Sequence, residues 1–203
     1  TIAAQKNGLS IEITTYRSES YDKESRKPDV QYGDSLEGDL SRRDFTVNAM
    51  ALQLDGKENL FIDPHNGMQD LIAKQLRTPG TPEQSFSDDP LRMMRAARFA
   101  AQLDFAIAPE VRVAIVEMAE RLQIISSERI RDEFVKTLMS ANPRLGLTVL
   151  VETGLAAQFL PELPALQLEI DEHHRHKDVY EHSLIVLEQA IDQEGRLGGP
   201  NLI

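Results

Sequence analysis

Residues 87–103 read SDDPLRMMRAARFAAQL, and the character of the chain changes at this stretch. The three polar residues before Pro90 are types that favour the N-terminus of a helix, and proline suits the first helical turn. Leu, Met, Ala and Arg, which make up most of the remainder, are good helix formers. The stretch therefore predicts a helix over 91–103 that begins directly after two carboxylates.

Helical patterns continue downstream of that helix. Three further helix starts are predicted, each at a proline or a capping residue: Pro109, Ser126 and Asn142. The first of these helices is expected to place Val113, Val116 and Ala119 on one side. Gly154 suits the end of the third, and residues 178–191 predict one more helix.

Upstream, residues 9–13 alternate between apolar and polar side chains. Leu9, Ile11 and Ile13 fall on one face of the predicted strand, and this face is expected to be buried. Glu12 points to the other face. It is either a solvent-facing residue or an accessory carboxylate near a two-metal site, in which carboxylates on neighbouring strands hold the ions.

The segment between this strand and the helix over 91–103 carries loop, strand and helix signals. Residues 18–41 are polar and predict a long loop. Asp55-Gly56 lies between alternating apolar residues, which predicts a hairpin, and residues 70–74 predict a short helix. Strands in the first part of the chain and helices in the second indicate an α+β fold.

The composition limits the classes of function. The chain of 203 residues has a formal net charge of −11, which argues against a large nucleic-acid interface because phosphate contacts dominate such binding. Local basic clusters nevertheless occur at Arg42-Arg43 and over 92–98. The chain has no cysteine, which excludes disulfides and thiolate metal sites, and no apolar run long enough to cross a bilayer.

Asp89 and Arg92 are three residues apart and therefore share one face of the predicted helix. One interpretation is a surface ion pair of little energetic weight. The other is a template for a base: cytosine and adenine present an amine beside a ring acceptor nitrogen, whereas uracil and guanine present a carbonyl beside an N–H. A carboxylate next to a guanidinium matches the first pattern and opposes the second. Arg95 and Arg98 follow at intervals of one turn.

Arg42-Arg43-Asp44 also has two interpretations. The three residues form either a solvated charged loop or a nucleotide-binding loop. In the second case the arginines contact the triphosphate, and Asp44 accepts a hydrogen bond from a ribose hydroxyl. Residues 45–50, with Asn48 among them, would anchor the loop in a core.

Four histidines, at positions 173, 174, 176 and 182, lie within ten residues. Their spacing is not that of a zinc finger, and no cysteine assists them. They belong either to a polar linker or to the start of a helical phosphohydrolase domain, with His182 as its first metal ligand.

In this order, the motifs resemble the class II CCA-adding tRNA nucleotidyltransferases and bacterial poly(A) polymerases. The resemblance is carried by a ribose-binding motif at 38–51, a base-template helix at 88–99, a connecting motif at 63–71, an accessory strand at 11–17, a neck at 127–130, a body at 154–163 and the start of an HD domain at 176–182. It implies a partial nucleotidyltransferase head (a mixed sheet with a hairpin) at 1–79. An all-α neck and body of the RNA-binding type would follow at 80–170, and the start of a helical HD-type domain at 171–203.

The resemblance also implies an activity, which is template-independent addition of CCA to the 3′ end of tRNA. CTP and ATP would be the substrates and Mg²⁺ the cofactor, in the cytoplasm and without a membrane or disulfide partner. The residues it assigns are Arg43 and Asp44 to the sugar and phosphates, Asp89, Arg92 and Arg95 to the base, Glu12 to the neighbourhood of the metals, Arg42, Asn48 and Arg98 to further nucleotide contacts, and His182 to a metal of the HD domain.

Two departures from the family pattern qualify this expectation. Asp88 stands where the family usually has Glu, and the chain contains no Asp-x-Asp pair near a Gly-Ser turn. The resemblance implies that this pair precedes Thr1, and that the chain is an internal piece of an enzyme, cut at both ends and inactive alone. The alternatives are a poly(A) polymerase that uses ATP only, an HD-type phosphohydrolase and a non-catalytic RNA-binding module.

Overall fold

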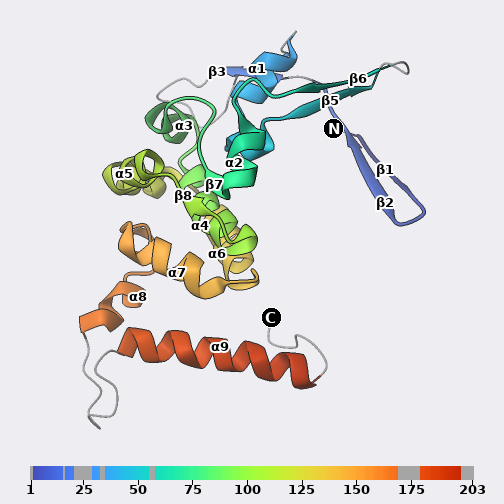
Figure 1. The fold of residues 1–203 in the computed structure, drawn as a ribbon. Coiled ribbons are helices and arrows are strands. Elements are labelled where there is room, and N and C mark those ends of the chain that lie inside the picture. Colours follow the sequence, from blue (N-terminus) through green and yellow to red (C-terminus); the bar gives the residue numbers. More distant parts are fainter. Residues whose placement is uncertain are drawn as a thin grey trace. The chain divides into compact units, whose positions relative to one another are not determined.

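The structure is a computed structural model that describes residues 2–15, 17–20, 29–32, 35–54, 58–168 and 179–197. The chain divides into two compact units, Thr1–Asp88 and Asp89–Ile203. Paired strands and short helices form the first unit, and helices dominate the second (Figure 1). The predicted α+β class is confirmed, although short helices lie between the strands of the first unit and β8 follows α4.

The first unit begins with a hairpin of β1 (Ile2–Lys6) and β2 (Leu9–Ile13), which pair antiparallel with Ile2 opposite Ile13. Its turn is Asn7-Gly8, and both residues have positive φ, as the two-residue hairpin turns of this type require. The predicted strand at 9–13 is therefore confirmed.

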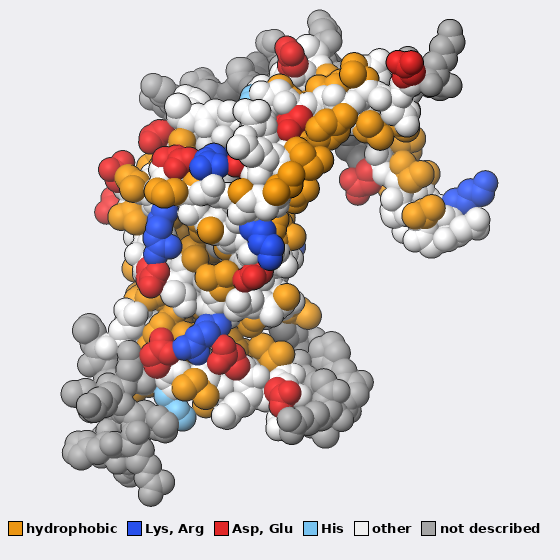
Figure 2. Space-filling view, in the orientation of Figure 1, with side chains coloured by type: hydrophobic (Ala, Val, Ile, Leu, Met, Phe, Trp, Pro, Cys, Tyr) orange, Lys and Arg blue, Asp and Glu red, His pale blue; other side chains and the backbone are white. Residues whose placement is uncertain are grey.

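The burial predicted for this strand is wrong. Leu9, Ile11 and Ile13 are all more than half exposed, and apolar side chains lie on the surface along the hairpins of the first unit (Figure 2). Alternation determines which side chains share a face, but burial requires another layer packed on that face. A two-stranded ribbon cannot supply that layer itself.

The long loop predicted over 18–41 is also wrong. Two strands, β3 (Arg17–Ser20) and β4 (Asp29–Tyr32), pair antiparallel there, and helix α1 (Leu36–Ser41) follows. Backbone hydrogen bonds form a ladder whatever the polarity of the side chains, so polar composition alone does not exclude strands. Serine is a residue type that favours the N-terminus of a helix, so Ser35 was a sequence signal for α1. In the structure its hydroxyl accepts a hydrogen bond from Gly38 N.

The remainder of the first unit contains a 3₁₀ helix, another hairpin and two short helices. A 3₁₀ helix η1 (Thr46–Asn48) leads into the antiparallel pair β5 (Ala51–Leu54) and β6 (Asn59–Ile62). This pairing confirms the predicted hairpin, whose residues Asp55-Gly56 lie outside the described part. The predicted short helix is α2 (Gly67–Ala73), three residues earlier than expected, and is followed by β7 (Gln75–Leu76) and α3 (Pro82–Asp88).

The second unit contains the predicted helices. They are α4 (Leu91–Leu103), α5 (Pro109–Met118), α6 (Ser127–Leu138), α7 (Pro143–Glu152) and α9 (Val179–Leu197); the shorter elements between them are β8 (Ala106–Ile107), η2 (Ala119–Ile124), η3 (Ala156–Gln158), α8 (Glu162–Ala165) and η4 (Leu166–Leu168). Gly154 has a φ of +76° and ends the turn after α7, as expected. Among the helices described, none has the length and apolar character that a bilayer crossing demands.

The three residues predicted to lie along one side of the helix that begins at Pro109 differ in burial, and Ala119, which is buried, begins η2. Val113 and Val116 are exposed, and the buried residues of this helix are Val111, Ala114 and Ile115. Both stripes have helical spacing, so periodicity alone does not choose between them.

Helix α4 packs against both α6 and α7 (Figure 1). Small side chains allow this close approach: Ala97 and Ala101 are fully buried. A Cβ added to Gly146 of α7 would lie 2.4 Å from Thr137 Cγ2 of α6 and 3.0 Å from Ala101 Cβ. The C-terminal half of α4 is therefore held by a well-packed three-helix contact.

Candidate functional site

Asp44 lies in the first unit and shapes the turn that follows it. Its carboxyl is buried, and Oδ1 accepts hydrogen bonds from Phe45 N at 2.9 Å and from Asn48 Nδ2 at 3.1 Å. Asn48, expected from the sequence to contact a nucleotide, places its amide on Asp44. The two residues together fix the start of η1.

Arg42 and Arg43 share one carboxylate on α1. Arg43 binds Asp39 Oδ2 through Nη2 at 2.9 Å and through Nε at 3.3 Å. Arg42 donates from Nε to Gly38 O at 3.2 Å and lies 3.6 Å from the other Asp39 oxygen. Asp39 was missed in the sequence, although its spacing of three and four residues from the arginines is typical of helical ion pairs. Arg43 is about half exposed, so its pair with Asp39 contributes little to stability.

The turn after Asp44 is anchored to α2 by a buried polar cluster. Thr46 Oγ1 donates to Asp70 Oδ2 at 2.7 Å, Arg77 pairs with the other Asp70 oxygen, and Thr46 N donates to Arg77 O at 2.8 Å. Asp63 accepts from Gly67 N at 2.7 Å at the start of α2. A Cβ on Gly67 would lie 2.1 Å from Thr46 O. Residues 63–77 thus support the loop that carries Arg42-Arg43-Asp44.

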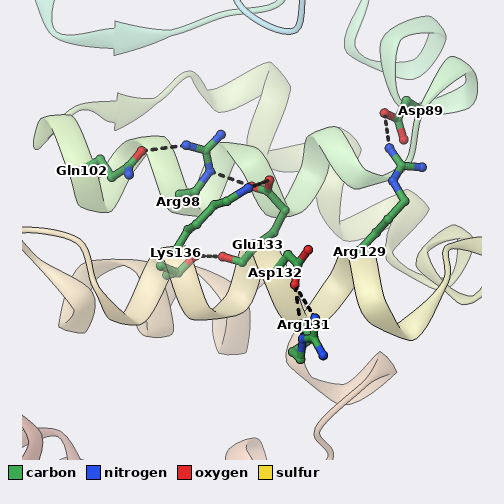
Figure 3. A network of polar contacts seen from close by, with 9 residues as sticks. Asp89, Arg98, Gln102, Arg129, Arg131, Asp132, Glu133 and Lys136 are labelled. Atoms are coloured by element: carbon green, nitrogen blue, oxygen red, sulfur yellow. Dashed lines mark hydrogen bonds and ion pairs between the residues drawn. The ribbon is translucent and has the colours of Figure 1, made fainter. Parts of the chain in front are cut away.

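Asp89 lies in the second unit, immediately before α4. Its Oδ1 accepts from Leu91 N at 3.1 Å, and its Oδ2 accepts from Arg129 Nη2 of α6 at 3.1 Å (Figure 3). The side chain is 21% exposed. An ionised carboxylate has about four acceptor positions, so these two contacts leave capacity for a further donor.

Arg92 is positioned on the same turn as Asp89. Its backbone N donates to Asp89 O at 3.0 Å, which closes the turn at the start of α4. Arg95 follows one turn later, with its guanidinium carbon 5.7 Å from the centre of the Phe99 ring. Asp89 and Arg92 thus belong to one backbone turn at the start of α4.

Arg98 is placed differently from the other two arginines of α4. Its Nε donates to Glu133 Oε2 of α6 at 2.6 Å, and its Nη1 donates to Gln102 Oε1 at 2.8 Å (Figure 3). The side chains of Arg98 and Glu133 are only 12% and 8% exposed. Arg98 thus joins α4 to α6. Glu133 could not be identified as the partner of Arg98 from local sequence signals, because the two residues are 35 positions apart.

The expected metal ligands do not gather in the part of the chain that the structure describes. Glu12 is exposed on β2, opposite Ala3 of β1. His182 is exposed on α9, and the other three histidines of its cluster lie outside the described residues. No group of three or more His, Cys, Asp or Glu side chains suited to a metal occurs within the described ranges. Among the described residues, neither Glu12 nor His182 therefore belongs to a cluster that could hold a metal ion by itself.

Two family models match the chain. One is described as the poly A polymerase head domain and matches residues 1–77. The other is described as the probable RNA and SrmB-binding site of polymerase A and matches residues 104–166.

Curated and solved relatives give the same family. The CCA-adding enzyme of Levilactobacillus brevis is 42% identical over 172 residues, which are 84% of this chain and 42% of the relative. The crystal structure of the Bacillus stearothermophilus CCA-adding enzyme in complex with CTP has 38% identity and a TM-score of 0.69, over 82% of this chain and 40% of that one. The Thermotoga maritima CCA-adding enzyme complexed with tRNA has 33% identity and a TM-score of 0.57, over 63% of this chain and 32% of that one. The chain thus spans less than half the length of each of these relatives.

Proposed function

This chain belongs to the family of class II CCA-adding tRNA nucleotidyltransferases and poly(A) polymerases, and on that premise we propose that it serves the addition of CCA to the 3′ end of tRNA from CTP and ATP. Its part in that reaction is the selection of the nucleotide. The solved relatives that contain CTP or tRNA support this proposal. Because tRNA would be the substrate, the proposed location is the cytoplasm.

The observation that carries the proposal is the arrangement of Asp89 and Arg92 on one turn at the start of α4. Asp89 accepts a hydrogen bond from the exocyclic amine of cytosine or adenine, and Arg92 donates to the adjacent ring nitrogen. Uracil and guanine would place a carbonyl against the carboxylate and an N–H against the guanidinium. A bidentate contact of this kind discriminates between bases by roughly 1–3 kcal/mol.

The loop of the first unit is proposed to bind the sugar and phosphates. Arg43 exchanges Asp39 for phosphate oxygens, which form stronger charge-assisted hydrogen bonds with a guanidinium. Arg42 lies beside it and contacts the same group. Asp44, already held by two hydrogen bonds, is a fixed acceptor for a ribose hydroxyl.

The remaining candidates receive supporting roles in this proposal. Arg95 extends the row of guanidinium groups one turn beyond Arg92. Asn48 holds Asp44, and Arg98 holds α4 against α6, so neither needs to touch the nucleotide. The proposed domains remain a head at 1–79, a neck and body at 80–170 and the start of an HD-type domain at 171–203. Mg²⁺ and the accessory role of Glu12 belong to the proposal for the full-length protein.

The test is extension of a tRNA that lacks its tail by the full-length protein. CTP and ATP together are expected to give CCA, CTP alone to stop after the cytidines, and UTP and GTP to give no product. A long run of adenosine from ATP alone, with CTP unused, would instead support a poly(A) polymerase. The match of residues 1–77 to the poly A polymerase head domain favours this alternative.

A further inference from the structure

Asp89 is held by a residue of α6 to which neither the motifs nor the comparisons assign a role. We infer that Arg129 is a positioning residue for base selection, because it fixes the carboxylate that reads the exocyclic amine. The inference rests on the proposed function and adds to it a residue 40 positions away in the sequence.

Two contacts, one at each carboxylate oxygen, define the orientation of Asp89. Leu91 N holds Oδ1 and Arg129 Nη2 holds Oδ2, each at 3.1 Å. A carboxylate bound at one oxygen only can rotate about its Cβ–Cγ bond, because this terminal torsion is broad. Binding at both oxygens restricts that rotation. The acceptor positions that remain are therefore held at fixed places relative to Arg92.

Arg129 reaches Asp89 because α6 is held against α4 one helical turn further on. Glu133 lies four residues after Arg129 and accepts from Arg98 Nε at 2.6 Å, while Lys136 Nζ lies 3.3 Å from its other oxygen (Figure 3). The buried Arg98–Glu133 pair fixes the two helices against each other. The more exposed Arg129–Asp89 pair lies at the end where the base is proposed to bind.

The exposure of Arg129 separates this role from a structural one. Its side chain is 52% exposed, and ion pairs of exposed groups contribute little to folding stability. Loss of the Arg129 guanidinium should therefore change the choice of base and leave the fold intact. Arg131 is a matched control, because it lies on the same helix, is 67% exposed and pairs only with its neighbour Asp132 among the residues described.

The experiment measures equilibrium binding of CTP, ATP, UTP and GTP to the full-length protein and to three variants of it. In Arg129→Gln, the ratio of CTP to UTP affinity is expected to fall by about tenfold, the scale on which a bidentate base contact discriminates. Arg129→Lys keeps the charge but not the planar fork, and an intermediate ratio is expected. Arg131→Gln is expected to keep the wild-type ratio. Thermal unfolding of each variant is measured in parallel.

The outcomes separate the inference from the function on which it rests. A wild-type chain that binds UTP as well as CTP would overturn the proposed base selection itself. A wild-type ratio retained in both Arg129 variants would overturn only the role of Arg129. So would an equal loss of affinity for all four nucleotides, which is the result of a merely structural role. If Arg129→Gln unfolds, the Arg129→Lys ratio decides.

Discussion

Replacement of Gly67 by alanine tests whether α2 supports the loop that carries Arg43 and Asp44. The added Cβ would lie 2.1 Å from Thr46 O, 2.8 Å from Thr46 C and 2.9 Å from Met50 Cγ. The first two of these atoms belong to the backbone, so relief requires that η1 and α2 move apart. Such overpacking costs about 3 kcal/mol, at the upper end of the usual range for inserted methylenes because a backbone has to shift.

For a unit of this size, each kcal/mol corresponds to roughly 4–8 °C in Tm. Gly67→Ala is therefore expected to lower the Tm of the first unit by at least about 10 °C, measured by circular dichroism, and to weaken nucleotide binding. Gly80→Ala is the matched control in the same unit, because nothing lies within 4 Å of its added Cβ. Equal melting temperatures for the two variants would refute the argument that η1 rests on α2.

Three further substitutions test other parts of the structure. Glu133→Ala leaves the buried Arg98 guanidinium without its carboxylate, and urea unfolding should show a loss of about 3–5 kcal/mol in the second unit; a loss below about 1 kcal/mol would contradict the burial of this pair. Burial raises the pKa of Tyr180 from its ordinary value of 10.0, and the neighbouring Thr148 has a smaller opposing effect. The folded protein therefore holds the Tyr180 proton more tightly than the unfolded chain does. The resulting contribution to folding stability is complete below pH 10 and is lost as the pH rises through the folded-state pKa. Tyr180→Phe should make stability less dependent on pH above about 10, and an unchanged dependence in alkaline unfolding curves would exclude this cause. Arg43→Gln should weaken all four nucleotides about equally without changing Tm, because Arg43 is proposed to contact phosphate; calorimetry that shows a change for only one base would contradict that role.

Local signals in the sequence were sufficient for the longer helices of the second unit and for the backbone turn at the start of α4. Pro90, Pro109 and Asn142 each precede or open a helix where the capping rules expect one. A backbone hydrogen bond joins Asp89 and Arg92 within one turn, and their spacing of three residues in the sequence already predicts this turn. These features depend on residues within about four positions of one another, so a single sequence contains them.

Contacts between distant segments could not be predicted in the same way. The bonds of Arg129 with Asp89 and of Arg98 with Glu133 join residues 40 and 35 positions apart. No periodicity encodes which side chain of a later helix meets an earlier one. The prediction that one face of β2 is buried was wrong for a related reason. Alternation describes the side chains of one strand, whereas burial depends on what packs against that strand.

The pairing of Arg43 with Asp39 implies a threshold for ligands at this loop. Before a ligand arrives, the guanidinium is already neutralised by a carboxylate of its own helix. An incoming molecule has to displace that internal counter-ion, and one negative charge offers little advantage over the one it replaces. The loop is thus suited to polyanions: affinity should climb steeply from nucleoside to monophosphate to triphosphate.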